Sequence, residues 1–358
     1  MTALDLSDEI YPTTKIATIL EALAAEGVSP DEALAGVELS KSQVFSIRTR
    51  VSLIQMIAFM HNADRLAPNP QFACNAGLRF RISTFGMFGF AILSSPTFRQ
   101  AVKFAVDYQQ LATPVTKISF KELNGCGIWT VSPLPHPGAE ARLCNSLVEF
   151  QFGILMSLHR DVLGPTFVPR ELHVTYAKAN DLPNYQDLFG CRVRFSQPEN
   201  RFIFNATWLD GKPPLGNELT HAMLANLCDR MLKDMRLNTG LVGKVRKLLL
   251  TNTIKPMTIE RVARNLGMSV RSLRRKLTEE NVSFRNVRNE LRRNMAIKYM
   301  HDGNLTIKEI AHALGFSDPT SFRHAFRRWT KSVPSDFRGP FGRARQAIPR
   351  FTGWPELP

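Results

Sequence analysis

Cysteine is scarce in this 358-residue sequence, and its placement excludes two common uses of the thiol group. The five cysteines are odd in number, lie far apart and form no Cys-x-x-Cys pair, so neither a disulfide framework nor a cysteine metal site is indicated. The eight histidines form no His-x-x-x-His or His-Glu-x-x-His pattern, and Gly-x-Ser-x-Gly is absent. We therefore expect free thiols in a reducing cytosol, no metal, no cofactor and no enzymatic activity.

Long apolar runs are also missing. The longest uncharged stretch, residues 82–98, is interrupted by Gly86, Gly89 and Pro96, and it is too broken to cross a membrane. The first residues of the sequence carry acids where a secretory signal carries positive charge. We expect a cytoplasmic chain without a membrane partner, and we interpret residues 82–98 as buried core.

An excess of one charge is missing from two thirds of the chain. Residues 1–240 hold 22 basic and 22 acidic side chains, whereas residues 241–350 hold 24 basic and 8 acidic ones. The net charge of +15 therefore belongs to the last third. A neutral body with a basic C-terminal module is typical of a protein that meets a polyanion with one end.

The apolar pattern predicts one α+β domain over residues 15–205. The first seventy residues repeat at helical spacing, and Asn124-Gly125, a hairpin turn signal, later separates two strand-like runs. A helix is expected after Pro96. Further elements are predicted as a helix over 141–162 and strands over 115–123, 127–131, 171–176, 192–195 and 201–205.

A domain boundary is indicated between Asp210 and Gly216, because two prolines and two glycines can continue neither a helix nor a central strand. Beyond it every pattern is helical. We predict four segments: an α+β domain at 1–210, a linker helix region at 211–240, an all-α domain at 241–338 and a flexible basic tail at 339–358.

Twelve residues of the basic region occur twice. Thr258–Ser269 recurs 48 residues later as Thr306–Ser317, with six identical positions. In each copy a threonine is placed to cap a helix, and an apolar i, i+3, i+4, i+7 stripe follows. Gly267 and Gly315 then end the helix where the chain needs a positive φ.

A second helix follows each glycine, over about residues 270–280 and 319–329, and it has one apolar and one basic side. A helix, a glycine turn and a second helix that exposes arginines is the helix-turn-helix arrangement, whose second helix enters the major groove of DNA. A single amphipathic hairpin has a purely structural explanation. Duplication, capping and the local charge excess together favour DNA binding.

Residues 284–301 are predicted to form one connecting helix between the two copies. A rigid connector would fix the distance between the two second helices, which on one face would enter successive major grooves about 34 Å apart. The apolar residues expected to face inward are Val287, Leu291, Met295 and Tyr299.

Residues 241–338 resemble the DNA-binding domain of the AraC/XylS family of bacterial transcription factors. The signature is ALGFSDPTSFRHAFRRWTKSVPSDFR, residues 313–338. Residues 15–205 resemble, more loosely, the arabinose-binding-type regulatory domain of a subset of that family, through GLRFRISTFGMFGFAILSSPTFRQA, residues 77–101. The resemblance implies an effector-responsive regulator, an activator by expectation, that binds double-stranded DNA, dimerises through residues 1–210 and contacts RNA polymerase.

The resemblance also implies that residues on the outward side of each second helix contact the edges of DNA bases. The residues implied are Arg271, Arg274, Arg275, Thr320, Arg323 and His324. Phosphate contacts are expected from Lys276, Arg288, Arg292, Arg327 and Arg328. For each arginine, phosphate contact or plain solvation stays an alternative to base reading.

The effector site is not defined by the sequence. Arg79 and Arg81, beside a glycine-rich apolar stretch, are candidates for an anionic ligand, against the alternative that both are simply exposed. Residues 218–236 form either a dimer seam or a linker that packs on the body. An enzyme that uses the basic module to find nucleic acid, and a sequence-blind architectural DNA protein, are the rival functions.

Overall fold

The computed structural model describes residues 6–136, 140–178, 185–251, 257–280, 282–302 and 305–337. Contacts between residues divide the chain into two units, Met1–Arg236 and Leu237–Pro358. The basic tail predicted at 339–358 lies outside the described residues.

The first unit begins with the predicted helical cap, and its helices bury one continuous apolar core. Two of them start at a serine in a capping box, Ser40 with Gln43 and Ser52 with Gln55, which satisfies backbone N–H groups at the helix ends. The elements are β1 (Tyr11–Pro12), α1 (Thr14–Ala25), α2 (Pro30–Ala33), α3 (Lys41–Val44), β2 (Arg50–Val51), α4 (Leu53–Leu66) and α5 (Phe72–Leu78).

A five-stranded sheet follows, in the order β3-β4-β7-β5-β6, and all of its strands lie within the runs predicted from the sequence or start one or two residues from them. The turn between the first two strands places Asn124 at φ 51° and Gly125 at φ 72°, the positive values that a tight hairpin requires. The strands are β3 (Thr116–Leu123), β4 (Cys126–Pro133), β5 (Glu171–His173), β6 (Arg192–Arg194) and β7 (Asn200–Asn205).

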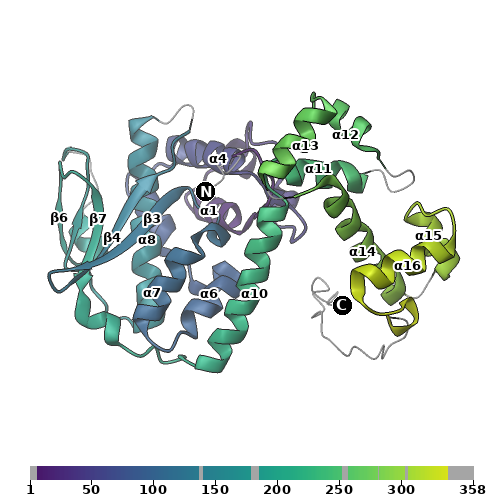
Figure 1. Ribbon diagram of the computed structural model, residues 1–358. Helices are drawn as coiled ribbons and strands as arrows, with labels where there is room; N and C mark the ends of the chain where they lie inside the picture. The colour runs from purple at the N-terminus through teal and green to yellow at the C-terminus, as the bar shows by residue number, and fades with distance from the viewer. Residues whose placement is uncertain are drawn as a thin grey trace. The chain divides into compact units, whose positions relative to one another are not determined.

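Helix α8 (Ala141–Leu163) is the central support of this unit, because it packs on α5 and on the sheet (Figure 1). Its crossing with α5 is closed by two glycines. A Cβ on Gly77 would lie 2.2 Å from the Phe150 carbonyl oxygen, and one on Gly153 would lie 2.5 Å from that of Cys74. The backbones can therefore approach this closely only where both side chains are absent.

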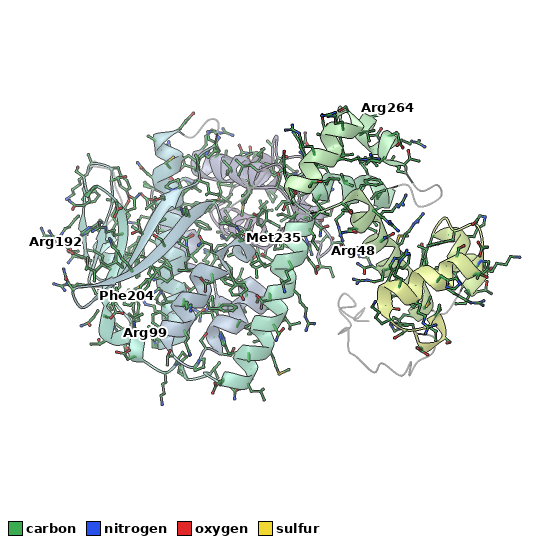
Figure 2. All side chains as sticks on the ribbon, viewed as in Figure 1. Arg48, Arg99, Arg192, Phe204, Met235 and Arg264 are labelled. Atoms are coloured by element: carbon green, nitrogen blue, oxygen red, sulfur yellow. The ribbon has the colours of Figure 1, made fainter. Side chains whose placement is uncertain are left out.

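Short helices complete the second core of the first unit, around the buried Phe204 (Figure 2). They are η1 (Ile82–Phe85), α6 (Gly86–Leu93), α7 (Phe98–Asp107), η2 (Gln109–Ala112), α9 (Tyr185–Phe189) and η3 (Ala206–Asp210). Within the described ranges, no single helix has the length and apolarity to cross a membrane. The bent pair Phe72–Leu78 and Ile82–Leu93 has the required length and apolarity only when the two helices are taken together.

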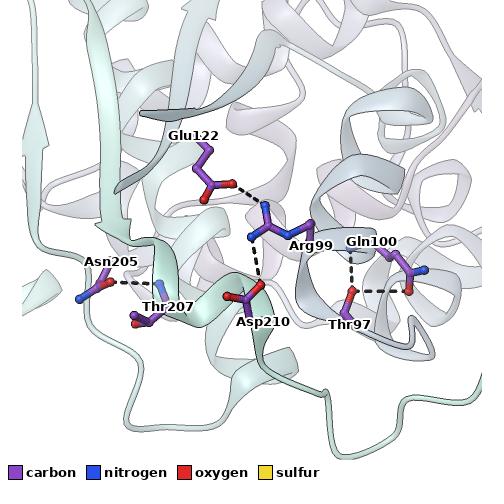
Figure 3. A network of polar contacts seen from close by, with 7 residues as sticks. All are labelled: Thr97, Arg99, Gln100, Glu122, Asn205, Thr207 and Asp210. Atoms are coloured by element: carbon purple, nitrogen blue, oxygen red, sulfur yellow. Dashed lines mark hydrogen bonds and ion pairs between the residues drawn. The ribbon is translucent and has the colours of Figure 1, made fainter. Parts of the chain in front are cut away.

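Arg99 on α7 joins three elements of the first unit. Its guanidinium group pairs with Glu122 on β3 and, at 3.0 Å, with Asp210 at the end of η3 (Figure 3). The helix that carries Arg99 is capped by Thr97, whose hydroxyl accepts the N–H of Gln100. The expected helix after Pro96 is thus present, with threonine rather than proline at its cap.

Helix α10 (Glu218–Leu237) packs on the first unit along one side. Cys228 is fully buried in the core, and Met235 packs against the core of the N-terminal helices (Figure 2). On its other side, large apolar residues are exposed: Leu219, Met223 and Met231.

The second unit is helical throughout its described residues. Its elements are α11 (Gly240–Thr251), α12 (Ile259–Asn265), α13 (Val270–Glu279), α14 (Phe284–Asp302), α15 (Ile307–Ala313), α16 (Pro319–Thr330) and η4 (Pro334–Phe337). The predicted fold class is confirmed: an α+β domain precedes an all-α domain with two helix-turn-helix motifs joined by a long helix.

Helix α14 supports two separate small cores. Val287 and Leu291 pack with α11, α12 and α13, whereas Ala296 and Met300 pack with α15 and α16 (Figure 1). The step from Leu291 to Ala296 turns the buried stripe by about 140°.

The sequence prediction placed Met295 and Tyr299 on the inward side, and both pack against the second core, but the most buried positions there were not predicted. Ala296 and Met300 are the fully buried residues, and Met295 and Tyr299 are partly buried beside them. The reason is that each half of α14 serves a different hairpin.

Candidate nucleic-acid interface

The first hairpin has the turn and the second-helix cap that its sequence predicts, but not the predicted cap at Thr258. Gly267 has φ 64° and follows the last turn of α12, which reverses the chain. Ser269 then caps α13, its hydroxyl accepting the N–H of Ser272 at 3.1 Å. Thr258 stands at the N-cap position of α12 without a side-chain cap to the backbone.

The second hairpin repeats this geometry with stronger caps. Thr306 and Glu309 form the predicted capping box of α15, and Gly315 has φ 73°. Asp318 caps α16 by accepting the N–H of Ser321 at 2.8 Å, and Pro319 occupies the first helical position. The hydrogen bonds from the backbone N–H and the hydroxyl of Ser321 lower the pKa of the Asp318 carboxyl, because they favour its charged form.

Helix α13 presents arginines on the side opposite its core. Leu273 and Leu277 are buried, while Arg271, Arg274 and Arg275 are exposed. The spacing i, i+3, i+4 places these three arginines on one helix face. Arg275 lies 3.6 Å from Glu279, an exposed pair that leaves the guanidinium accessible.

Helix α16 has the same two-sided character. Phe322 and Phe326 are fully buried, and Thr320, Arg323 and His324 are exposed at i, i+3, i+4. The six residues for which base reading was predicted are therefore all exposed, three on each helix. Among them, Arg275 alone has an ion pair in the described part of the second unit, with Glu279.

The five residues expected at phosphates fall into two groups. Lys276, Arg327 and Arg328 are exposed. Arg288 and Arg292 on α14 are partly buried, and each guanidinium lies over an aromatic ring: Phe284 at 6.0 Å and Phe316 at 5.0 Å. Exposed Arg264 on α12 adds a basic side chain that was not predicted as a contact (Figure 2).

Two capped hairpins, each with a buried apolar face and an exposed basic one, define the class: this is a helix-turn-helix DNA-binding protein. Residues 27–212 match the family described as the arabinose-binding domain of AraC transcription regulator, N-terminal. Residues 262–339 match a helix-turn-helix domain family. The chain belongs to the AraC family of transcriptional regulators, as the resemblance predicted.

Three individual proteins are similar to this chain. The chain is 27% identical over 336 residues to the ornithine utilization regulator of Pseudomonas aeruginosa, a match that covers 94% of this chain and 98% of the relative. Over 94 residues, 26% of this chain and 32% of the relative, it is 35% identical to the transcriptional regulator SirC of Salmonella typhimurium. The crystal structure of the regulator CdpR from Pseudomonas aeruginosa aligns with a TM-score of 0.49 at 21% identity, covering 91% of this chain and 98% of that one. The two family matches together make the chain a transcriptional regulator.

The two arginines considered for an effector are both on the surface of the first unit. Arg79 is exposed, and Arg81 pairs with Asp161, whose other oxygen accepts the N–H of Ile82 at 2.8 Å. Neither arginine lines an apolar cavity that this unit contains. Among the described residues, no group of three or more His, Cys, Asp or Glu side chains is placed to hold a metal ion.

That cavity has a volume of about 80 Å³ and was not predicted from the sequence. Its walls come mainly from apolar side chains of α6, α7, α8, β3 and β4. One cation lines it, Lys15 of α1, which is 3% exposed. A signal existed in the sequence, because Lys15 stands at i−4 and i−8 from the core residues Ile19 and Leu23, on the apolar face of its helix.

Proposed function

We propose that the chain binds promoter DNA sequence-specifically by placing α13 and α16 in two successive major grooves. The observation that carries this proposal is the exposed basic face on each of two equivalent, separately capped helices. Half-sites about one helical turn apart would then be contacted from one side of the duplex. Because α13 and α16 differ in their exposed residues, the two half-sites should differ in sequence.

The residues have separate roles in this proposal. Arg271, Arg274 and Arg275 suit guanine O6 and N7, whereas Thr320 suits a thymine methyl and Arg323 and His324 suit base edges. Lys276, Arg327 and Arg328 contact phosphates, which position the helices without reading sequence. Arg288 and Arg292 are proposed to contact phosphates as well.

The regulatory half of the proposal concerns residues 1–210, with 211–240 as a linker helix region and 241–338 as the DNA-binding domain. A small effector bound to the first unit shifts the population of the DNA-competent arrangement. The exposed apolar side of α10, with Leu219, Met223 and Met231, is suited to a homodimer seam. Contact with RNA polymerase at the promoter would follow DNA binding.

Capture of fragmented genomic DNA by the full chain tests this function. A captured promoter fragment should compete at fixed salt at least about a thousandfold better than random DNA. Equal competition by random DNA would instead support a sequence-blind architectural protein.

A further inference from the structure

Lys15 is buried, and its amino group has no carboxylate partner in the described part of the chain. Its Nζ donates one hydrogen bond, to the Thr113 carbonyl oxygen at 3.0 Å, and lies 5.8 Å from the centre of the Phe85 ring. Thr113 is 2% exposed and holds a φ of 49°, an uncommon value for threonine. An ammonium group has three donors, and burying its charge without a carboxylate partner opposes folding.

The cavity that Lys15 lines is otherwise apolar, with few polar groups. Gln109 is fully used, since its amide nitrogen donates to Val106 and Ile118 carbonyls and its oxygen accepts the Ile118 N–H. The Gln151 oxygen accepts the Thr116 hydroxyl at 3.0 Å. Within the described residues, the Gln151 amide nitrogen has no hydrogen-bond partner, so it stays free for a ligand.

His159 is the other titratable side chain that lines the cavity, and it is not a second cation. Burial lowers its pKa to about 4. Its Nε2 accepts the Trp129 indole N–H at 3.2 Å, and its Nδ1 donates to the Leu155 carbonyl at 2.6 Å. A neutral imidazole with both nitrogens used leaves Lys15 as the one charge that faces the cavity from its lining.

We propose that this cavity binds a compact apolar monocarboxylate, whose carboxylate pairs with Lys15 Nζ and accepts a hydrogen bond from the Gln151 amide. The hydrocarbon part would lie among Phe88, Phe98 and Val102. A volume of about 80 Å³ has room for roughly five to eight water molecules. This size suits a branched or aromatic acid and not a long-chain fatty acid. The role of this acid as effector rests on the proposed regulatory function, but its binding does not.

The position of the cavity explains how such a ligand would affect the packing of the first unit. Lys15 lies on α1, whose apolar residues belong to the core of the N-terminal cap, whereas Phe88, Phe98 and Trp129 belong to the core around the sheet. Phe85 and Leu158 contact both cores and line the cavity. A bound acid would therefore tie α1 to α6, α7 and the sheet.

Binding should also move a proton. Burial lowers the pKa of Lys15 to about 7, so above this pH the empty site is mostly neutral. A carboxylate favours the ammonium form, so the complex takes one proton from the buffer onto Nζ.

Titration calorimetry and thermal unfolding of the full chain test the proposal, with benzoate and 3-methylbutanoate as probes and benzamide and 3-methylbutanamide as neutral matches. Both measurements should detect at least one acid and neither amide. At pH 8 the binding heat should vary with the ionisation enthalpy of the buffer, as proton uptake requires. Equal binding of acid and amide, or no binding of either acid at millimolar concentration, would overturn the proposal.

Lys15→Met removes the cation at similar volume and should weaken acid binding by about 10- to 100-fold. Lys103→Met, at an exposed position of the neighbouring helix α7, is the matched control and should bind as wild type does. Should Lys15→Met fail to fold, Lys15→Gln supplies the same comparison. Unchanged affinity in the folded variant would refute the role of Lys15.

The outcome is separable from that of the proposed function. Promoter capture without acid binding would refute the monocarboxylate site and leave the regulator intact. Acid binding by a chain that fails to discriminate promoter DNA would refute sequence-specific DNA binding and leave the monocarboxylate site intact.

Discussion

The guanidinium group of Arg292 lies over the ring of Phe316, with 5.0 Å between Cζ and the ring centre. Arg292 belongs to α14 and Phe316 to the turn between α15 and α16, so the contact joins the connecting helix to the second hairpin. Phe316 in turn packs on Phe322 and Trp329, with ring centres 5.6 and 5.9 Å apart. Burial, and then the neighbouring charge of Arg288, lower the pKa of Arg292.

Replacing Arg292 with alanine should loosen the second hairpin, because the cation–π contact contributes about 1 kcal/mol when partly desolvated. Hydrogen exchange of α15 and α16 peptides in the full chain measures the effect. Arg292→Lys keeps the charge but not the planar stack, so it should restore little of the protection. Unchanged protection in both variants, with DNA affinity lost only in Arg292→Ala, would support the phosphate role instead.

Arg274→Ala should relax base preference at one position of the first half-site, at a cost of about 1 to 3 kcal/mol for the preferred base. Lys276→Ala, on the flank of the same helix, should weaken all sequences alike and reduce the salt dependence by about one unit of slope. Binding of each variant to a captured promoter and to its single-base variants distinguishes the two. Identical behaviour of both variants would mean that the division into base and phosphate contacts is wrong.

Lys15 should make the stability of the ligand-free protein depend on pH. Burial lowers its pKa from the ordinary value of 10.5 to about 7 in the folded chain, so between these values the unfolded chain binds the proton and the folded chain does not. Stability should therefore rise as pH increases from about 7 to about 10. Below pH 7 the cost of burying the charge is fully present.

Lys15→Met should remove this part of the pH dependence and stabilise the ligand-free chain at pH 6, on the order of a few kcal/mol. Urea unfolding at several pH values provides the comparison, with Lys103→Met as control. A destabilised Lys15→Met chain with the wild-type pH profile would show that Lys15 supports the fold rather than a ligand.

Gly77→Ala should destabilise the first unit by about 1 to 3 kcal/mol or more, since the added Cβ meets backbone of α8 that cannot move aside. Thermal unfolding measures the loss. Ser83→Ala, at an exposed site in η1, should leave the melting temperature nearly unchanged. Equal melting temperatures for both variants would mean that α5 and α8 are not in close backbone contact.

The second unit was predictable because its determinants are local. The determinants that act within a few residues are the turn glycines and the caps at Ser269, Thr306 and Asp318. Because the pattern occurs twice in the sequence, the prediction had two independent observations behind it. The exposed faces of both second helices followed from the same 3.6-residue period.

The first unit was less predictable because its key contacts join distant segments. The Gly77–Gly153 crossing and the Lys15–Thr113 hydrogen bond each connect positions more than seventy residues apart, and no local pattern specifies the partner. Arg79 and Arg81 were candidates because of the glycine-rich apolar sequence beside them. The cavity is instead lined by Lys15, which lies on the apolar face of α1. The change of face within α14 was missed for a related reason, since a periodic pattern does not tell which neighbour each half meets.

Footprinting of the full chain on a captured promoter tests the central claim most directly. Two protected segments should lie about 10 base pairs apart, centre to centre, on one side of the duplex. Arg274→Ala should weaken protection of one segment and Arg323→Ala that of the other. A single protected segment, or loss of the same segment in both variants, would contradict two recognition helices reading two grooves.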